Sequence, residues 1–312
     1  MNQSISIVTS LYKSYVFLDE FISRTLEALK VVNCSDFELI FVNDGSPDDS
    51  VDLLLQKQLT IPQIKIIDLA RNFGHHYALQ AGLKYAKGDY IFIIDNDLET
   101  PPEILIDFYY ELTSNMQLDV VYGYQEFRKG AKFERISGKL FWNMFNQLSP
   151  VKVPPNILTE RFMTRQYIDS LLEMNDSNLF LGGMFYWVGY NQKGIPVKKG
   201  LRITKSTYSF SKKINLMLYA ITSFSSKPLE WMFKFGIFVS SFSFLFLIVI
   251  GLNKLLNGDA VQVGWTSVVA SIVFVLGVIS TFLGLIGIYI GKIYTQVQGR
   301  PNVVIKKIYE QH

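Results

Sequence analysis

The stretch Asp89–Glu103, DYIFIIDNDLETPPE, decides the fold class of this chain. Its apolar run, Tyr90–Ile94, has the length and composition of a buried strand, and Asp95, Asn96 and Asp97 follow that run directly. On an extended backbone the side chains of Asp95 and Asp97 point to the same face. The repulsion between two such carboxylates is relieved by protonation of one of them or by a bound cation. The alternative interpretation is that these residues simply begin a turn.

Other segments repeat the pattern of an apolar run followed by a helix. The expected strands are Ser4–Ser10, Phe37–Val42 and Lys65–Leu69, and helical spacing occurs in Phe17–Val32 and Ser50–Gln58. Strands that alternate with helices predict crossover connections and a parallel sheet. The N-terminal part of the chain is therefore expected to be an α/β domain.

A second strand is also expected to end in polar residues, because Asn43 and Asp44 follow Phe37–Val42 directly. In parallel sheets, ligands bind beyond the carboxyl ends of the strands. Neither GxGxxG after a strand nor GxxxxGK[ST] occurs, so dinucleotide-binding and P-loop sites lose their main support. Mg²⁺ and Mn²⁺ accept one or two protein carboxylates and take their other ligands from water and phosphate. The acids therefore predict a site where such a cation bridges the protein to a diphosphate.

The C-terminal third is expected to enter a membrane. The chain has 312 residues, 49% of them hydrophobic, and two stretches, Phe233–Leu252 and Trp265–Ile290, contain one Lys and no charge respectively. Each is near the roughly 20 residues that a helix needs to cross a bilayer. Two transmembrane helices are favoured over the alternative of buried core helices. Lys and Arg lie on the outer flanks of the pair, which places both flanks in the cytoplasm of a multi-pass plasma-membrane protein.

This pattern divides the chain into four parts. Residues 1–212 form the expected cytoplasmic domain, 213–232 an amphipathic juxtamembrane segment, 233–292 the transmembrane hairpin and 293–312 a cytoplasmic tail. The single Cys34 excludes an intrachain disulfide, and three His without metal-binding spacing argue against zinc. A net charge of +3 is too small to indicate a nucleic-acid partner. No signal peptide is expected, because the first residues contain neither a basic leader nor a long apolar run.

Four segments together resemble a known family. VNDGSPDDS, DLARNFGHHYALQAGLKYAKGDYIFIIDNDLETPPE, DVVYGYQEFRKG and FLGGMFYWVGYNQKGIP, followed by the two apolar stretches, are similar to the polyprenyl-phosphate glycosyltransferases of glycosyltransferase family 2. The resemblance implies a GT-A fold, a nucleotide-sugar donor, a divalent cation (Mg²⁺ or Mn²⁺) and a polyprenyl-phosphate acceptor such as undecaprenyl phosphate. It further implies a metal-dependent inverting transferase of hexosyltransferase type that acts in cell-surface glycan assembly, and a homo-oligomer.

The resemblance also implies roles for individual residues. Asp95 and Asp97 are implied to be catalytic. The residues implied to bind the nucleotide are Tyr12, Asp44, Arg71 and Asp95. The residues implied to bind the metal are Asp95, Asp97 and Glu99. The residues implied to contact the phosphates or the acceptor are Arg128, Arg135, Arg161 and Arg202.

The sequence departs from the family pattern at several of these places. Ser10, Lys13 and Ser14 stand where the family has Pro, Asn and Glu, and Thr stands in place of characteristic family residues at Thr100, Thr159 and Thr207. An ionised phosphate acceptor does not need a strong general base, so the loss of an Asp at Thr159 is compatible with transfer. The clustered changes predict an unusual sugar.

Three features have two interpretations each. The basic run from Arg128 to Arg135 is either a phosphate-binding surface, favoured for its two Arg, or a solvated helix face. The aromatic segment 136–148 is either a core helix or an interfacial one, which is favoured. His75 and His76 are expected to pack or cap a helix rather than to act in catalysis.

Alternative functions are an inactive, membrane-anchored nucleotide-sugar-binding protein and a transferase that acts on a glycan. A processive polysaccharide synthase would need a QxxRW-type segment, which the sequence lacks.

Overall fold

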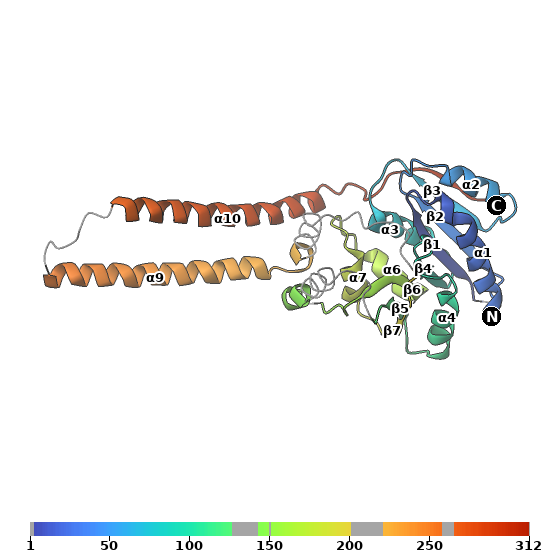
Figure 1. Cartoon of the computed structure of the whole chain (residues 1–312), viewed down its shortest axis with the longest axis horizontal. Coiled ribbons are helices and arrows are strands. Elements are labelled where there is room, and N and C mark those ends of the chain that lie inside the picture. Colours follow the sequence, from blue (N-terminus) through green and yellow to red (C-terminus); the bar gives the residue numbers. More distant parts are fainter. Residues whose placement is uncertain (1–2, 127–142, 150, 201–220, 258–264, 312) are drawn as a thin grey trace.

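The computed structural model describes residues 3–126, 143–149, 151–200, 221–257 and 265–311. It consists of an α/β domain from which two long helices project (Figure 1). The four strands predicted from apolar runs are confirmed as β1 (Ile5–Leu11), β2 (Phe37–Asn43), β3 (Ile64–Leu69) and β4 (Tyr90–Ile93). The expected α/β class is therefore correct.

The sheet has eight strands in the order β7-β5-β6-β4-β1-β2-β3-β8. Its additional strands are β5 (Val120–Tyr124), β6 (Ile157–Thr164), β7 (Gln192–Pro196) and β8 (Ile305–Tyr309). The predicted parallel pairing holds for β3-β2-β1-β4, whereas β6 pairs antiparallel with β4 and β5, and β8 pairs antiparallel with β3. The sheet is thus mixed rather than wholly parallel.

Helices cover both faces of this sheet. They are α1 (Tyr15–Val31), α2 (Ser50–Gln58), α3 (His75–Tyr85), α4 (Ile104–Ser114), α6 (Arg165–Glu173) and α7 (Leu181–Trp187). One apolar core contains residues of α1, α2 and α4, and the other contains residues of α3, α6 and α7. The central strands β1 to β4 are mostly apolar because both of their faces are buried.

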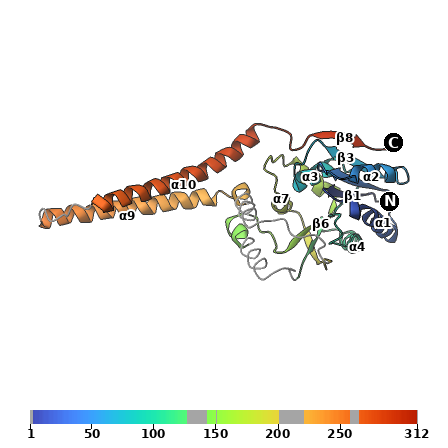
Figure 2. The same ribbon diagram turned by 45° about the horizontal axis from the view of Figure 1, so that its top comes forward.

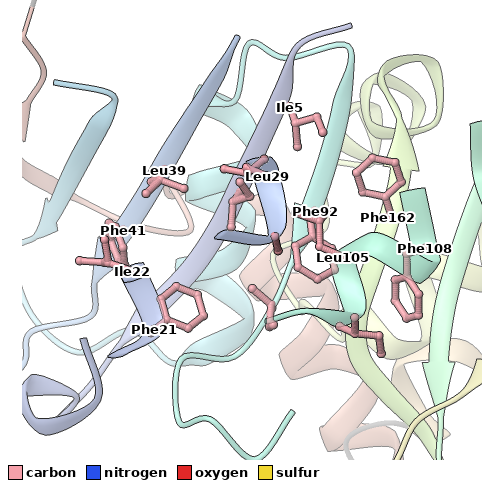
Figure 3. Packing of buried hydrophobic residues seen from close by; sticks show 14 of the residues in the cluster. Ile5, Phe21, Ile22, Leu29, Leu39, Phe41, Phe92, Leu105, Phe108 and Phe162 are labelled. Atoms are coloured by element: carbon pink, nitrogen blue, oxygen red, sulfur yellow. The ribbon is translucent and has the colours of Figure 1, made fainter. Parts of the chain in front are cut away.

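The first of these cores combines aliphatic side chains with several Phe rings. Figure 3 shows Phe92 of β4 with Phe108 of α4 and Phe162 of β6, and the ring centroids of Phe92 and Phe108 lie 6.1 Å apart in an edge-to-face arrangement. Burial of each such side chain contributes about 1.5–3 kcal/mol. This packing fixes β4 in the sheet, and Asp95 and Asp97 follow that strand.

The segment expected to be a cytoplasmic tail contributes a strand to the sheet. Beside β8, Lys65 of β3 is only 3% exposed, and its ammonium lies 3.2 Å from Glu38 and 3.0 Å from Glu310. A buried ammonium requires such partners. Residues 305–309 therefore belong structurally to the α/β domain. In the sequence, two long helices lie between these residues and the rest of that domain.

Those helices are α9 (Lys227–Asn257) and α10 (Trp265–Val297), which lie side by side in both views (Figures 1 and 2). Within the described residues, one stretch, Val275–Val297, has the length and apolar composition needed to cross a membrane. Large apolar side chains are also exposed on α9, including Phe233, Phe238 and Phe242. Both helices extend beyond the boundaries expected from the sequence.

The aromatic segment before β6 is described only in part. Phe145 and Leu148 are buried, and the Phe145 ring packs against Phe180 and Phe224. For these two residues the core interpretation is correct and the interfacial one is wrong. Residues 136–142 lie outside the described part of the chain.

Candidate active site

The carboxyl ends of β1, β2 and β4 bring Ser10, Asp44 and Asp95 to one edge of the sheet. Asp44 is 3% exposed. Its two carboxylate oxygens accept hydrogen bonds from the backbone amides of Phe73, at 2.7 Å, and Gly74, at 3.0 Å. Burial raises the pKa of Asp44, and these two amide bonds oppose that rise. Asp44 therefore holds the loop that starts α3, while its contact with a nucleoside stays a prediction.

Gly45 permits the close approach of that loop. Its backbone φ is +64°, and a Cβ at this position would lie 2.6 Å from the amide nitrogen of Asn72 and 2.7 Å from the carbonyl carbon of Arg71. Both atoms belong to the backbone, so they cannot move aside as a flexible side chain can. Glycine is required here for its conformation and for its small size.

We expect Gly45→Ala to displace the loop and to weaken the binding of nucleoside diphosphates by at least about tenfold, with a loss of about 1–3 kcal/mol in unfolding free energy. Gly189 is a matched control, because its φ is +82° but nothing lies within 4 Å of an added Cβ. Gly189→Ala should show only the backbone cost. Equal nucleotide affinity in both variants, measured by calorimetry, would contradict the role of Gly45.

Asn96 fixes the turn that carries the two acids. Its side-chain amide donates to the carbonyl oxygen of Ser10 at 2.7 Å and to Oγ1 of Thr9 at 3.2 Å. Asn96 is 5% exposed, whereas 28% of the Asp95 side chain is exposed. Asn96 thus turns inward to β1, whereas the side chain of Asp95 remains partly exposed.

Asp97 and Glu99 occupy the turn that follows. Oδ1 of Asp97 accepts from the amide of Glu99 at 3.0 Å, and the intervening Leu98 has a φ of +58°. The Glu99 carboxylate lies 3.5 Å from the ammonium of Lys199, and the Glu99 carbonyl accepts from the amide of Gly200 at 2.7 Å. The segment after β7 is thus attached to the acidic turn, and Glu99 already has a lysine partner.

Two members of this cluster, Glu160 and Lys199, are not among the site residues predicted from the sequence. Glu160 lies in β6 beside β4, is completely buried, and has no hydrogen-bond partner for either carboxylate oxygen among the described residues. Glu160 was detectable in principle as a charge within the otherwise mostly apolar run ILTERFM. No local signal marks Lys199, because its proximity arises from the pairing of β7 with β5.

The electrostatics of the cluster favour a cation. Burial and the neighbouring charge of Asp97 raise the pKa of Asp95 to about 6, and burial together with Asp95 raises the pKa of Glu160. Burial by itself lowers the pKa of Lys199. The nearby carboxylates of Glu160 and Asp95 act more strongly in the other direction, so the Lys199 pKa is raised. In the described part of the chain, the four carboxyl groups of Asp95, Asp97, Glu99 and Glu160 share this cluster with one ammonium, that of Lys199.

The protein supplies few ligands for such a cation. Among the residues described, no group of three or more His, Cys, Asp or Glu side chains is arranged to hold a metal ion. A site with one or two carboxylates fits Mg²⁺ or Mn²⁺ when phosphate and water complete the coordination. Asp95 and Asp97 meet this requirement, whereas the contact of Glu99 with Lys199 makes Glu99 the weakest of the three predicted ligands.

Of the other residues predicted for the site, some lie near this sheet edge and some lie outside the described residues. Tyr12 follows β1 and is 51% exposed, and the guanidinium of Arg71 stacks on the Phe73 ring with a distance of 4.0 Å to its centroid. Both lie next to the edge where Asp44 and Asp95 meet. Arg128, Arg135 and Arg202 lie outside the described residues, as does Thr207.

Arg161 is enclosed rather than presented at the surface. It is 1% exposed, and its guanidinium lies 4.2 Å from the ring centroid of Phe185 and 5.3 Å from those of Tyr122 and Tyr186. Neighbouring strand residues face opposite sides, so Arg161 points into the α7 side of the sheet while Glu160 points the other way. This placement gives no support to the predicted phosphate contact.

Comparisons with known proteins identify the family of the chain. The model of the family described as glycosyl transferase family 2 matches residues 6–172. An uncharacterized glycosyltransferase, YkcC, of Bacillus subtilis is 33% identical over 97% of this chain and 94% of its own length. A protein described as putative glycosyltransferases from Mycobacterium tuberculosis is 36% identical over 98% and 88%. The bactoprenol glucosyl transferase of Shigella phage SfII is 31% identical over 91% and 92%. The chain therefore belongs to glycosyl transferase family 2, with a GT-A-like α/β domain.

Proposed function

We propose that the protein transfers a sugar from a nucleotide-sugar donor to a polyprenyl phosphate, with undecaprenyl phosphate as the expected lipid. One observation carries this proposal: an acidic cluster at the carboxyl ends of β1, β2 and β4 lies in a chain that also contains a helix of membrane-spanning length. The similarity to a bactoprenol glucosyl transferase supports a lipid acceptor.

The connection of α10 to the domain supports a two-helix membrane hairpin. α9 leaves the domain after residue 226, and the chain returns after α10 to form β8 in the same sheet. Because both ends meet on one side, the chain must cross a membrane an even number of times. We propose that α9 and α10 each cross the plasma membrane once, with the catalytic domain in the cytoplasm.

The acidic edge is also linked to the membrane helix. The amide of Ser177 donates to Gln296 of α10 at 2.8 Å, and the carbonyl of Ser177 accepts from the hydroxyl of Tyr77 in α3 at 2.9 Å. Tyr77 is two residues from His75, whose ring nitrogen lies 3.6 Å from Asp95. These contacts support an acceptor phosphate that reaches the site from the membrane surface.

The proposed reaction is a single displacement with inversion. A phosphate oxygen of the lipid attacks the anomeric carbon, the bond from that carbon to the donor diphosphate breaks, and the diphosphate leaves with the electron pair. A divalent cation, when bound at Asp95 and Asp97, supplies positive charge for the leaving diphosphate. Asp44 keeps the loop before α3 in place, and Asn96 holds the turn of Asp95 and Asp97. The acceptor is ionised near neutral pH, so no side chain needs to remove a proton.

The direct test is to incubate membranes containing the protein with undecaprenyl phosphate and a panel of nucleotide sugars. Mass spectrometry of the organic extract should reveal a lipid that is heavier by one sugar residue, only with divalent cation and one class of donor. Donor binding without any lipid product would favour the alternative of an inactive sugar-nucleotide-binding protein. A water-soluble glycan product would indicate a different acceptor.

We expect the affinity for Mn²⁺ to depend on pH. The pKa of Asp95 is raised to about 6, so its carboxylate binds a proton below that pH and carries its charge above it. Protonation competes with the cation, so Mn²⁺ affinity should fall by up to about tenfold for each pH unit below 6 and level off above about pH 7. Electron paramagnetic resonance titrations in Asp95→Asn should show a weaker and flatter profile. If Asp95→Asn showed the same pH profile as the unsubstituted protein, Asp95 would not be a ligand of the cation.

A further inference from the structure

His75 connects the ends of two strands that carry the site. It is the first residue of α3, and its Nδ1 lies 2.7 Å from the hydroxyl oxygen of Ser10 at the end of β1. On the other side of the ring, Nε2 lies 3.6 Å from Oδ1 of Asp95 at the end of β4. His75 therefore stands between Ser10 and Asp95, with both ring nitrogens directed at a site residue.

The hydroxyl group of Ser10 makes the contact with Nδ1 of His75 possible. It stands where the resembling family has Pro, which has no hydroxyl group to offer to an imidazole. The carbonyl oxygen of Ser10 also accepts the side-chain amide of Asn96 at 2.7 Å. Ser10 is thus linked to the acidic turn in two ways. Its carbonyl oxygen contacts Asn96 directly, and its hydroxyl group contacts His75, which lies next to Asp95.

The chemistry of the three groups fixes one arrangement of protons. An ionised carboxylate can only accept, so an attractive contact with Asp95 requires the proton of neutral His75 on Nε2. Nδ1 is then an acceptor, and Ser10 must donate its hydroxyl proton to it. The distance of 3.6 Å to Asp95 is longer than a hydrogen bond, but such contacts commonly shorten when substrate binds.

The backbone of His75 is also held in place. The amides of Phe73 and Gly74, immediately before it, are bound by Asp44. Gly74 has a φ of +108° at the position where α3 begins. The imidazole therefore projects from a fixed helix start rather than from a free loop, and 41% of the His75 side chain is exposed.

We propose that His75, oriented by Ser10, is a positioning residue for Asp95: it occupies Oδ1 of the carboxylate and leaves the second oxygen available to a cation that would in turn bind the donor diphosphate. This inference rests on the proposed donor site and goes beyond it by assigning His75 and Ser10 a function. Residues that orient a metal ligand in this way typically change metal affinity or activity by about 10–100-fold when replaced.

Two amide substitutions separate positioning from packing. The amide of Gln reaches about as far as Nε2 of His, whereas the amide of Asn reaches only as far as Nδ1. We expect His75→Asn to weaken Mn²⁺ binding and to lower kcat by about 10–100-fold, and His75→Gln to retain both within about fivefold. Ser10→Ala leaves the helix unchanged and should lower kcat by about tenfold. Its ¹⁵N spectrum should show loss of the single His75 tautomer.

His76 provides the control at the same helix start. Its ring packs against Phe180 at a centroid distance of 5.9 Å. His76→Asn and His76→Gln should therefore resemble each other. Mn²⁺ titrations decide the inference without turnover: equal affinities in His75→Asn, His75→Gln and the unsubstituted protein would overturn it. Absence of any lipid-linked product from the unsubstituted protein would instead refute the proposed function.

Discussion

Replacement of Asp97 by Asn should abolish formation of lipid-linked sugar while the protein still folds and accumulates. The amide oxygen introduced by Asp97→Asn can still accept the hydrogen bond from the backbone amide of Glu99, which is 3.0 Å long in the structure, so the turn should survive. The substitution removes the negative charge that faces the proposed cation. Loss of transition-state charge stabilisation of this kind typically lowers kcat by about 10²–10³-fold.

The measurement is the initial rate of sugar transfer into organic-extractable lipid at saturating donor and Mn²⁺. Asp107→Asn is the control, because it makes the same chemical change at an exposed position on α4. It should transfer sugar at the unsubstituted rate. Turnover of Asp97→Asn within about threefold of that rate would defeat the assignment of Asp97, even if the protein proved to be a transferase.

The second large effect is expected from removal of β8. A stop after Val304 takes away the strand that pairs with β3 and leaves the ammonium of Lys65, which is 3% exposed, without Glu310 at 3.0 Å. Lys65 keeps Glu38 at 3.2 Å, so the loss of Glu310 should cost less than the roughly 3–5 kcal/mol of a buried charge left without any partner, and the lost strand pairing adds to this cost. We therefore expect a protein that unfolds at much lower urea concentration or fails to accumulate.

A stop after Glu310 is the matched control, since it retains the whole of β8 and its partner for Lys65. Tryptophan fluorescence during urea unfolding in detergent should show an unchanged midpoint for this control. Glu310→Gln removes the negative charge but keeps the strand. Its urea midpoint should therefore lie between those of the proteins that end at Val304 and at Glu310. If the protein that ends at Val304 unfolded at the same midpoint as the control, the strand would contribute nothing to stability.

The centre of the fold was predictable because its signals are local. β1 to β4 are short apolar runs bounded by polar turns, and the acids that follow β2 and β4 must meet at one edge once the strands are parallel. The positions of Asp44, Asp95 and Asp97 at one sheet edge follow from this logic. The strand pattern does not reveal the hydrogen bonds of Asp44 to the loop before α3, because the close approach of that loop depends on Gly45. The expected contact of Asp44 with a nucleoside does not follow from the strand pattern either.

The remaining features depend on contacts between distant parts of the chain. Lys199 reaches the acidic turn only because β7 pairs with β5, and Glu160 reaches it because β6 pairs with β4. Arg161 was expected at a phosphate, but strand alternation directs it to the α7 side of the sheet, where its guanidinium lies against the rings of Phe185 and Tyr186. The sequence IKKIY of β8 resembles an ordinary charged tail and becomes a strand only against β3.

The place of β8 in the chain also sets an order of synthesis. β8 follows both α9 and α10, so the ribosome must release both helices before β3 can gain its neighbour. Until then the nascent domain exposes the unpaired edge of β3, a surface that favours aggregation and recognition by chaperones. In the proposed two-helix membrane topology, completion of the sheet would therefore follow insertion of α9 and α10, and a chain that stalls during insertion would keep the edge of β3 unpaired.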